Sequence, residues 1–568
     1  MINLLKKLMD NKNIDGYIIP KNDEFFSEYS SPNRLKLVSN FSGSAGLAII
    51  LKDKNLLFVD GRYTLQASIE CEKNFKIFEI PKIRPFEVIK KIKDKLTLGF
   101  DPKLFTEISL KSNFRDACNL IPINNNLIDE IFNLKNNHKT KEFYCLSEII
   151  AGERITSKLN RLSSILKKKK IQIIFISAPE NCAWLLNIRG FDNPNSPIPN
   201  CQIILNNKNI YFFSDIKKIK KIKKIKNLIK YKKIKFYKFK EFPKVINNLK
   251  GKNFSIDRNS CSIFNKSIIL SKFNILNEVD PCYSLKAIKN KNEIKNIIDA
   301  HIEDGAALTK FLYWIKSKKN FNLTEIDAEK KLENFRKKNT NFLYPSFNTI
   351  AGSGPNSAII HYRANKNSNR KIKKTDIFLC DSGGQYKYGT TDVTRTVCFS
   401  KPTSKIKNIF TRVLKGHIAV SNTNLNKINT GEEIDKRARV SLKKINLDYS
   451  HGTGHGVGYF LNVHEGPQSI SKFNNVKIRP GMIVSNEPGY YKKKKFGIRI
   501  ENLVYVKKDK KNIQFKNLTL APIDIDLINF KMLNSTEKKY LHNYHLDIYS
   551  KISKYLTNSE KKWLLDLI

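Results

Sequence analysis

The sequence predicts a mixed α/β fold in which two related α/β domains precede a third, α+β domain. Its 568 residues, 40% hydrophobic and 11% aromatic, can bury several cores. The same order of helix and strand occurs twice in the first half, and the pattern changes near Ser284. We therefore expect domains at residues 1–145, 146–287 and 288–568.

The first two domains are predicted from a repeated order of elements. In each copy an amphipathic helix precedes an apolar strand, and two further strands follow. The predicted elements are a helix at 4–9 and strands at 16–20, 47–51 and 56–59 in the first copy, and a helix at 159–166 and strands at 171–177, 202–205 and 210–213 in the second.

The third domain is predicted to open with a long helix. Apolar residues recur with a period near 3.6 over 292–316. Thr324, followed by Asp327, resembles a capping box that opens another helix through Phe335. Strands and glycine-rich turns follow Phe342, and residues 535–568 read as two amphipathic helices.

The charge is strongly basic, with 103 Lys and Arg against 52 Asp and Glu and a net charge of +51. Such a balance is typical of proteins that bind nucleic acid or anionic membranes. Lysine is abundant throughout, however, alongside the other residues of A/T-rich codons, so we attribute the charge to base composition. The run 217–240 is either a basic helix face or a solvated connector. We expect no specific nucleic-acid partner and no membrane association.

A cytoplasmic location is predicted from the cysteines and the N-terminus. The nine cysteines form no Cys-x-x-Cys pair, which is typical of a reducing compartment. The first residues lack the apolar core of a signal peptide, and no stretch approaches eighteen uncharged apolar residues.

Two predicted hairpins carry pairs of carboxylates. The apolar run 377–381 ends in Asp381, and Asp392 opens the next strand, so a turn centred near Tyr386 and Lys387 would place the two aspartates opposite one another. Directly opposed residues have Cβ atoms about 4.5 to 5.5 Å apart, where like charges are destabilising unless a cation lies between them.

The arrangement recurs in strands at 482–487 and 498–506. A turn centred near Lys494 would place Glu487 opposite Glu501. Four carboxylates with one histidine would suit two hard divalent cations about 3.5 to 4 Å apart. The pattern therefore predicts a dinuclear metal hydrolase.

The histidine comes from a glycine-rich segment. His451 and His455 have the spacing of a helical zinc pair, but alternate residues from 452 to 458 are glycine and no His-Glu-x-x-His motif is present, so we expect a loop or strand edge. Each residue alone has an ordinary structural explanation, as a turn former or a hydrogen-bonded core histidine. Their joint pattern carries the prediction.

The motifs resemble those of the pita-bread metallopeptidases and, within that family, the three-domain Xaa-Pro aminopeptidases. The resemblance spans nearly the whole chain, and it implies a pita-bread catalytic domain. It is carried by 359–362, 381–384, 389–395, 451–458, 463–467, 485–490 and 497–502, with 41–46, 59–63 and 184–190 upstream.

The resemblance implies a ligand set for two metal ions. Asp381 would bind one ion, Asp392 and Glu501 would bridge both, and His455 with Glu487 would hold the other. Members of the family commonly use manganese, and oxygen-rich ligands with one imidazole suit Mn²⁺. Ser357 and Tyr388 replace an expected Gly and Asp, and neither matches a ligand position.

The resemblance also implies the reaction. A metal-bridged hydroxide would release the first residue from peptides with proline second. His361, His451 and His464 would surround the substrate, and Arg499 would hold Asp381. The N-terminal domains would form one wall of the cleft, and a homodimer is expected.

Three alternatives share parts of this pattern. Prolidases use the same catalytic apparatus on Xaa-Pro dipeptides, and methionine aminopeptidases lack the two preceding domains. Some pita-bread proteins have lost the metals and serve as binding modules. The intact ligand positions argue against a metal-free module, and the duplicated first half and the tail favour the aminopeptidase.

Because we attribute the basic charge to base composition, we expect binding to duplex DNA or RNA to be weak and to fall steeply with salt. Fluorescence anisotropy with labelled duplexes at low and physiological salt measures this. Tight, sequence-selective binding at physiological salt would contradict the attribution.

Overall fold

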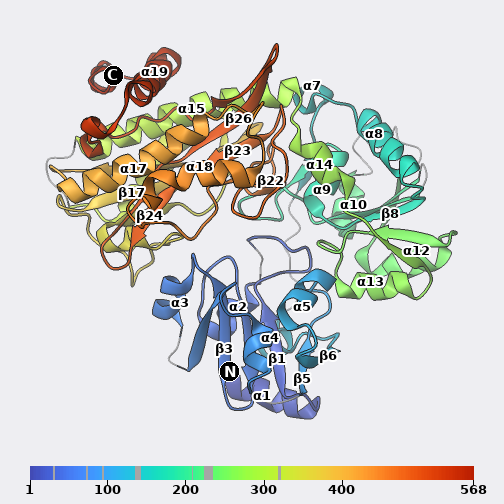
Figure 1. Ribbon diagram of the computed structural model, residues 1–568. Helices are drawn as coiled ribbons and strands as arrows, with labels where there is room; N and C mark the ends of the chain where they lie inside the picture. The colour runs from blue at the N-terminus through green and yellow to red at the C-terminus, as the bar shows by residue number, and fades with distance from the viewer. Residues whose placement is uncertain are drawn as a thin grey trace. The chain divides into compact units, whose positions relative to one another are not determined.

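The computed structural model describes residues 1–29, 32–71, 74–92, 95–134, 142–206, 209–222, 234–317 and 322–568. The chain forms two compact units (Figure 1), one of Met1–Ser147 with Glu153–Cys282 and one of Glu148–Gly152 with Tyr283–Ile568. The predicted α/β fold class is confirmed. The boundaries after residues 145 and 287 stay predictions.

The first unit contains two six-stranded sheets of the same topology, which confirms the predicted duplication. Their strand orders are β4-β3-β2-β1-β5-β6 and β12-β11-β10-β8-β13-β14, and corresponding pairs share the same parallel or antiparallel sense. The strands are β1 Gly16–Pro20, β2 Leu47–Leu51, β3 Asn55–Asp60, β4 Phe75–Ile80, β5 Leu96–Phe100, β6 Cys118–Pro122, β8 Ile173–Ile176, β10 Gln202–Asn206, β11 Asn209–Phe213, β12 Ile234–Tyr237, β13 Asn253–Ile256 and β14 Asn274–Asn277.

The central strands are apolar at successive positions because both faces of the sheet are covered. In β1, Tyr17 and Ile19 belong to one buried cluster, whereas Ile18 belongs to another. A strand buried on both faces has no solvent-facing positions to make polar.

Helices and a short strand pair complete the first unit. The middle of the basic run, 223–233, lies outside the described residues, and its flanks form α10 and β12. The elements are α1 Ile2–Asn11, α2 Arg34–Ser39, α3 Thr64–Glu70, α4 Pro85–Ile89, α5 Glu107–Phe114, α6 Leu127–Phe132, α8 Ile155–Lys168, α9 Pro179–Leu185, α10 Ile216–Ile222, α12 Phe242–Asn248 and α13 Ile263–Leu270, with β7 Phe143–Cys145 paired to β9 Ile188–Gly190.

The first long helices of the second unit begin at side-chain caps, one of which was predicted. Asn290 caps α15 by accepting hydrogen bonds from two main-chain N–H groups, and Thr324 forms the predicted capping box with Asp327. Both tail helices are confirmed. The helices are α7 Glu148–Ala151, α14 Pro281–Ala287, α15 Lys291–Lys316, α16 Glu325–Lys337, α17 Ser404–Ser421, α18 Gly431–Lys443, α19 Ser535–Ile552 and α20 Asn558–Leu565.

Figure 1 shows α15, α17 and α18 gathered around the strands of this unit. Helix α17 contacts β23, β24, β25 and β27. The strands are β15 Phe342–Pro345, β16 Ile350–Ser353, β17 Ile377–Ser382, β18 Gly384–Tyr386, β19 Gly389–Thr390, β20 Val393–Cys398, β21 Gly454–Gly456, β22 Glu465–Ile470, β23 Ile483–Asn486, β24 Gly489–Lys492, β25 Phe496–Arg499, β26 Asn502–Asp509 and β27 Asn512–Asn517.

The state of the cysteines and the length and apolarity of the helices relate to the predicted cytoplasmic location. All nine cysteines are free thiols. Among the helices of the described ranges, none combines the length and apolarity needed to cross a bilayer.

Candidate metal centre

The first hairpin holds two of the candidate ligands, in a register that differs from the prediction. Asp381 on β17 lies opposite Thr394 on β20, not opposite Asp392. The shift is two residues, and an even shift leaves every side chain on its predicted face. Asp381 and Asp392 therefore remain on one face, as diagonal neighbours.

The turn explains the shifted register. Tyr386 pairs with Gly389, so Lys387 and Tyr388 form the tip, one residue later than predicted. Tyr388 adopts a φ of 93°, a conformation that side chains rarely take, to close this tip. Each residue of displacement at the tip moves the opposing partner by two.

The second hairpin has the predicted register. Asn486 pairs with Asn502 at the end of β23 and β26, and β24 with β25 continues in the same register around Lys494. Glu487 and Glu501 therefore face one another in the gap between the two pairs of strands.

One predicted strand, 498–506, is interrupted at Ile500 and Glu501. The Ile500 N–H still donates to the Pro488 carbonyl oxygen of the same hairpin, at 3.3 Å, but the next N–H bonds to the other hairpin. The Glu501 N–H donates to the Thr394 carbonyl oxygen at 3.2 Å. The two hairpins are thereby joined at the point where their carboxylates meet.

His455 lies on the short strand β21, between β22 and β23, and not on a helix or at the edge of the sheet. A Cβ at Gly454 would stand 1.9 Å from the Ser485 carbonyl oxygen, so the glycine permits this close approach. His455 Nδ1 donates to the Gly456 carbonyl oxygen at 2.9 Å. Nε2 is thus the nitrogen left to bind a cation.

The candidate ligand atoms converge. One potential ligand atom each from Asp392, His455 and Glu501 lies within 4.8 Å of the others. His455 Nε2 is 3.4 Å from Asp392 Oδ2 and 3.5 Å from Glu487 Oε1. Carboxylate oxygens with one imidazole match the donors that hard or borderline divalent cations prefer.

Asp381 is held on one side only. Arg499 Nη2 donates to its Oδ2 at 2.6 Å, which confirms the predicted contact. Its Oδ1 is buried and accepts no hydrogen bond from the described residues. A buried acceptor without a donor calls for a ligand, and a cation would supply one.

The pKa shifts of the clustered residues also indicate a site for a cation. Burial, together with the charges of Asp381 and Glu487, raises the pKa of Asp392 to about 6, although its hydrogen bond to His455 lowers it. Burial also raises the pKa of Glu501, with Asp392 contributing. Burial alone would lower the pKa of His455, but the neighbouring Asp392 and Glu487 carboxylates outweigh this effect and raise the pKa to about 9. Without a cation the site binds protons in its place.

Tyr491, which sequence reasoning missed, joins His451 to Arg499. His451 Nδ1 donates to Gly452 O at 2.7 Å, so its Nε2 accepts from the Tyr491 hydroxyl at 2.9 Å. Arg499 Nη1 donates to the Tyr491 oxygen at 2.6 Å. Tyr491 is four residues after Glu487, a spacing that could have revealed it in a strand pattern.

Two hydroxyl residues support the glutamates and were also missed. Thr394 Oγ1 donates to Glu501 Oε2 at 2.7 Å and accepts from Arg499 Nε at 3.0 Å. Ser485 Oγ donates to Glu487 Oε1 at 3.0 Å. Each lies two residues from a candidate ligand, on the same face of its strand.

The remaining predicted histidines lie near the cluster. The His464 ring centroid is 4.2 Å from that of His455. Ile360, which precedes His361, accepts a long hydrogen bond from Arg499 Nη2 through its carbonyl oxygen, at 3.5 Å. The structure therefore brings all nine predicted site residues to one region of the second unit.

A second acidic group is structural. Cys398, Asp524 and Asp526 lie close enough to hold an ion. Lys316 Nζ, however, bonds Asp524 at 2.6 Å and Asp526 at 2.8 Å. The positive charge there is supplied by the protein itself.

The carboxylate cluster on paired hairpins defines a metallohydrolase of the pita-bread type. The chain belongs to metallopeptidase family M24, whose model matches residues 295–508. Models of the creatinase/prolidase N-terminal domain match 1–131 and 135–293, and the C-terminal region of peptidase M24 matches 511–567.

Relatives match along the full chain. A probable Xaa-Pro aminopeptidase P of Laccaria bicolor is 36% identical, over 99% of this chain and 91% of the relative. The crystal structure of X-prolyl aminopeptidase from Caenorhabditis elegans, described as a cytosolic enzyme with a di-nuclear active site, has a TM-score of 0.92 at 28% identity, covering 100% of this chain and 98% of that one. The prolidase from Pyrococcus furiosus, at 25% identity and TM-score 0.51, covers 65% of this chain and 99% of its own.

We predict that added Mn²⁺ stabilises chelator-treated protein more at pH 8 than at pH 5. The raised pKa values of Asp392 and His455 mean that their proton-linked stability is present at low pH and lost as pH rises through about 6 and about 9. For Asp392 the loss between pH 5 and pH 8 is of the order of 1 kcal/mol, because about one unit of its raised pKa lies above pH 5. A cation replaces those protons.

Thermal unfolding midpoints with and without Mn²⁺ across this pH range measure the effect. Asp392→Asn should flatten the dependence. A metal-induced shift of equal size at both pH values would contradict the prediction.

Proposed function

We propose that this protein is a metal-dependent exopeptidase that releases the N-terminal residue from peptides with proline in the second position. The carboxylate cluster around His455 is the observation that carries the proposal. The names of the full-length relatives, Xaa-Pro aminopeptidase P and X-prolyl aminopeptidase, support the choice of substrate.

Two divalent ions, which we propose to be Mn²⁺, would be held by the five candidate ligands. Asp381 would bind one ion, and His455 with Glu487 the other, while Asp392 and Glu501 would contact both. Asp381 Oδ1, which accepts no hydrogen bond from the described residues, and His455 Nε2, which a cation would bind in place of a proton, fit these roles. When bound, the ions supply Lewis acidity and activate water at neutral pH.

The chain's own residues would bind and orient the substrate. We assign the free amino terminus of the peptide to the acidic side of the cluster, which explains exopeptidase action because an internal residue offers no cation. His361, His451 and His464 would contact the peptide around the scissile bond and pass a proton to the leaving proline nitrogen. The Gly452 carbonyl oxygen sets the His451 tautomer, the Tyr491 hydroxyl donates to His451 Nε2, and Arg499 orients Asp381 through a charge-assisted hydrogen bond.

The principal alternative is a prolidase. The Pyrococcus furiosus prolidase covers only part of this chain, whereas the aminopeptidase relatives cover nearly all of it. The additional N-terminal sequence favours an enzyme that accepts residues beyond the proline. A metal-free binding module is disfavoured because all five candidate ligands are present.

The proposal includes a cytoplasmic location and a homodimer. Nine free thiols and the description of the Caenorhabditis elegans relative as cytosolic support the location. Light scattering of the purified protein tests the dimer, which rests on family resemblance.

We expect Asp392→Ala and Glu501→Ala to lower bound Mn²⁺ from two ions to at most one, because each carboxylate would contact both ions. Peptidase activity should fall at least 100-fold, since one positioned electrostatic group contributes about that much. Metal analysis after gel filtration measures the stoichiometry.

Asp526→Ala is the matched control, because it removes a carboxylate from the structural acidic group and should retain two ions. Two ions in the Asp392 and Glu501 variants would contradict their assignment as shared ligands. Full activity in metal-free protein would contradict the proposed mechanism.

We expect release of the first residue from Xaa-Pro-Xaa and longer peptides, with little turnover of Xaa-Ala-Xaa. Proline has no amide hydrogen and a fixed ring, so a site shaped for it loses complementarity when alanine replaces it. Chromatography of the released amino acid measures both rates. Cleavage of Xaa-Pro dipeptides alone would identify a prolidase, and indifference to the second residue would overturn both assignments.

A further inference from the structure

Behind the sheet, away from the metal centre, side-chain hydrogen bonds link β23 to β26 by way of helices α17 and α19. The Tyr540 hydroxyl and Asn486 Nδ2 both donate to Ser421 Oγ, at 3.0 and 3.1 Å. Asn517 Nδ2 donates to the Tyr540 oxygen at 3.2 Å, and Asn502 Nδ2 donates to Asn517 Oδ1 at 3.2 Å. We call these five residues the rear chain.

The two ends of the rear chain adjoin candidate metal ligands. Asn486 precedes Glu487 and Asn502 follows Glu501, and the asparagines form the last pair of β23 and β26. Successive side chains along a strand point to opposite faces. Groups that hold the asparagines behind the sheet therefore also orient the glutamates in front of it.

A second tyrosine, Tyr544, lies beside Asn502, the end of the rear chain on β26. The Tyr544 hydroxyl lies 3.2 Å from Asn502 Oδ1 and accepts a hydrogen bond from Arg395 Nη2 at 2.8 Å. Arg395 Nη1 also donates to the main-chain oxygen of Glu501 at 2.6 Å. Tyr540 and Tyr544 lie one turn apart on α19, with nearly parallel rings 6.3 Å apart. One helix thus presents two hydroxyls to the back of the metal centre.

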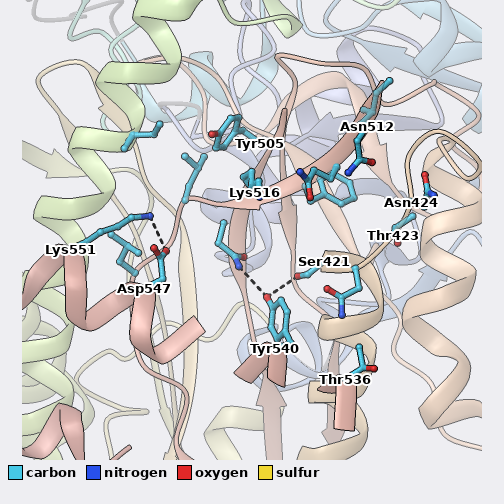
Figure 2. A pocket seen from close by; sticks show the side chains of 18 residues that line it. Ser421, Thr423, Asn424, Tyr505, Asn512, Lys516, Thr536, Tyr540, Asp547 and Lys551 are labelled. Atoms are coloured by element: carbon cyan, nitrogen blue, oxygen red, sulfur yellow. Dashed lines mark hydrogen bonds and ion pairs between the residues drawn. The ribbon is translucent and has the colours of Figure 1, made fainter. Parts of the chain in front are cut away.

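A cavity of 740 Å³ lies beside the rear chain, and Ser421, Asn517 and Tyr540 line it. Figure 2 shows Tyr540 hydrogen bonded to Ser421 at the cavity wall, with the ion pair of Asp547 and Lys551 on another part of the wall. The cavity leaves Ser421, Asn517 and Tyr540 with open space on one side, while Tyr540 also packs against the apolar core that includes Tyr544.

We infer that Tyr540 and Tyr544 of α19 are positioning residues for the metal centre, acting on Glu487 and Glu501 through the rear chain and Arg395. The inference rests on the proposed function, since it requires that these glutamates bind metal. Removing the Tyr540 hydroxyl leaves the ring in place but takes away the hydrogen bonds to Ser421 and from Asn517, while Asn486 keeps its bond to the His417 carbonyl oxygen at 2.9 Å. Removing the Tyr544 hydroxyl takes away a contact of Asn502 Oδ1, which Arg395 Nη2 still bonds at 2.8 Å. Each change therefore loosens one support of the asparagines and leaves another in place. Groups that orient metal ligands typically change affinity by about 10- to 100-fold when they are lost.

The test is Mn²⁺ binding to chelator-treated full-length protein, followed by electron paramagnetic resonance of the free ion. We expect Tyr540→Phe with Tyr544→Phe to weaken binding about 10-fold. Tyr555→Phe, which removes the hydroxyl of a 43% exposed tyrosine beyond the end of α19, should bind as the wild type does. The thermal midpoint of each metal-free variant is measured in parallel.

Ser421→Ala provides a second, milder variant that removes the acceptor shared by Asn486 and Tyr540. Weaker binding in Ser421→Ala, with no further loss when Tyr540→Phe is added, would support action through the rear chain. If the tyrosine variants bind Mn²⁺ with wild-type affinity, the inference is overturned, even where their thermal midpoint falls. If those variants do not fold, wild-type affinity in Ser421→Ala overturns it instead. Absence of Mn²⁺ binding in the wild type would instead overturn the proposed function and this inference with it.

Discussion

The close approach of buried carboxylates is the constraint on which the second unit depends. Asp392 and Glu501 are 4% and 2% exposed, and their ligand atoms lie within 4.8 Å of one another. Two unit charges about 4 Å apart at an effective dielectric constant of 20 repel by about 4 kcal/mol. Without a cation the protein meets this cost by raising carboxyl pKa values, and with one the repulsion becomes attraction to the ion.

The backbone holds these charges together because their positions follow from strand register. Glu487 and Glu501 lie where one antiparallel pairing stops and the next begins, and the Glu501 N–H there bonds to the other hairpin. Neutral hydroxyls of Thr394 and Ser485 then orient the carboxylates without adding charge. The candidate ligands are thus held in place by the protein alone, as the groups of preorganised sites are.

Positive charge in the interior is matched to specific acceptors, although the chain as a whole carries a large excess. Arg499 bonds to Asp381, and Lys286 with Lys289 holds Glu465 beside His464. A buried cation without a partner would be costly to desolvate. The net charge of +51 therefore reflects the many exposed lysines and is separate from the electrostatics of the metal centre.

The sequence by itself determined the element order and the duplicated α/β half, and it supplied the nine candidate site residues. Apolar periodicity indicates which residues are buried, and carboxylates at strand ends indicate candidate metal ligands. Both patterns can be recognised within short stretches of chain. Only the tertiary structure decided the exact pairing of Asp381 with Thr394, which depends on where the turn closes, and the break in the strand at Ile500 and Glu501. It also decided the roles of Tyr491, Thr394 and the α19 tyrosines. Most of their partners are distant in sequence, and for Thr394 and the α19 tyrosines no local pattern distinguishes a support for a candidate ligand from an ordinary residue of a strand or helix.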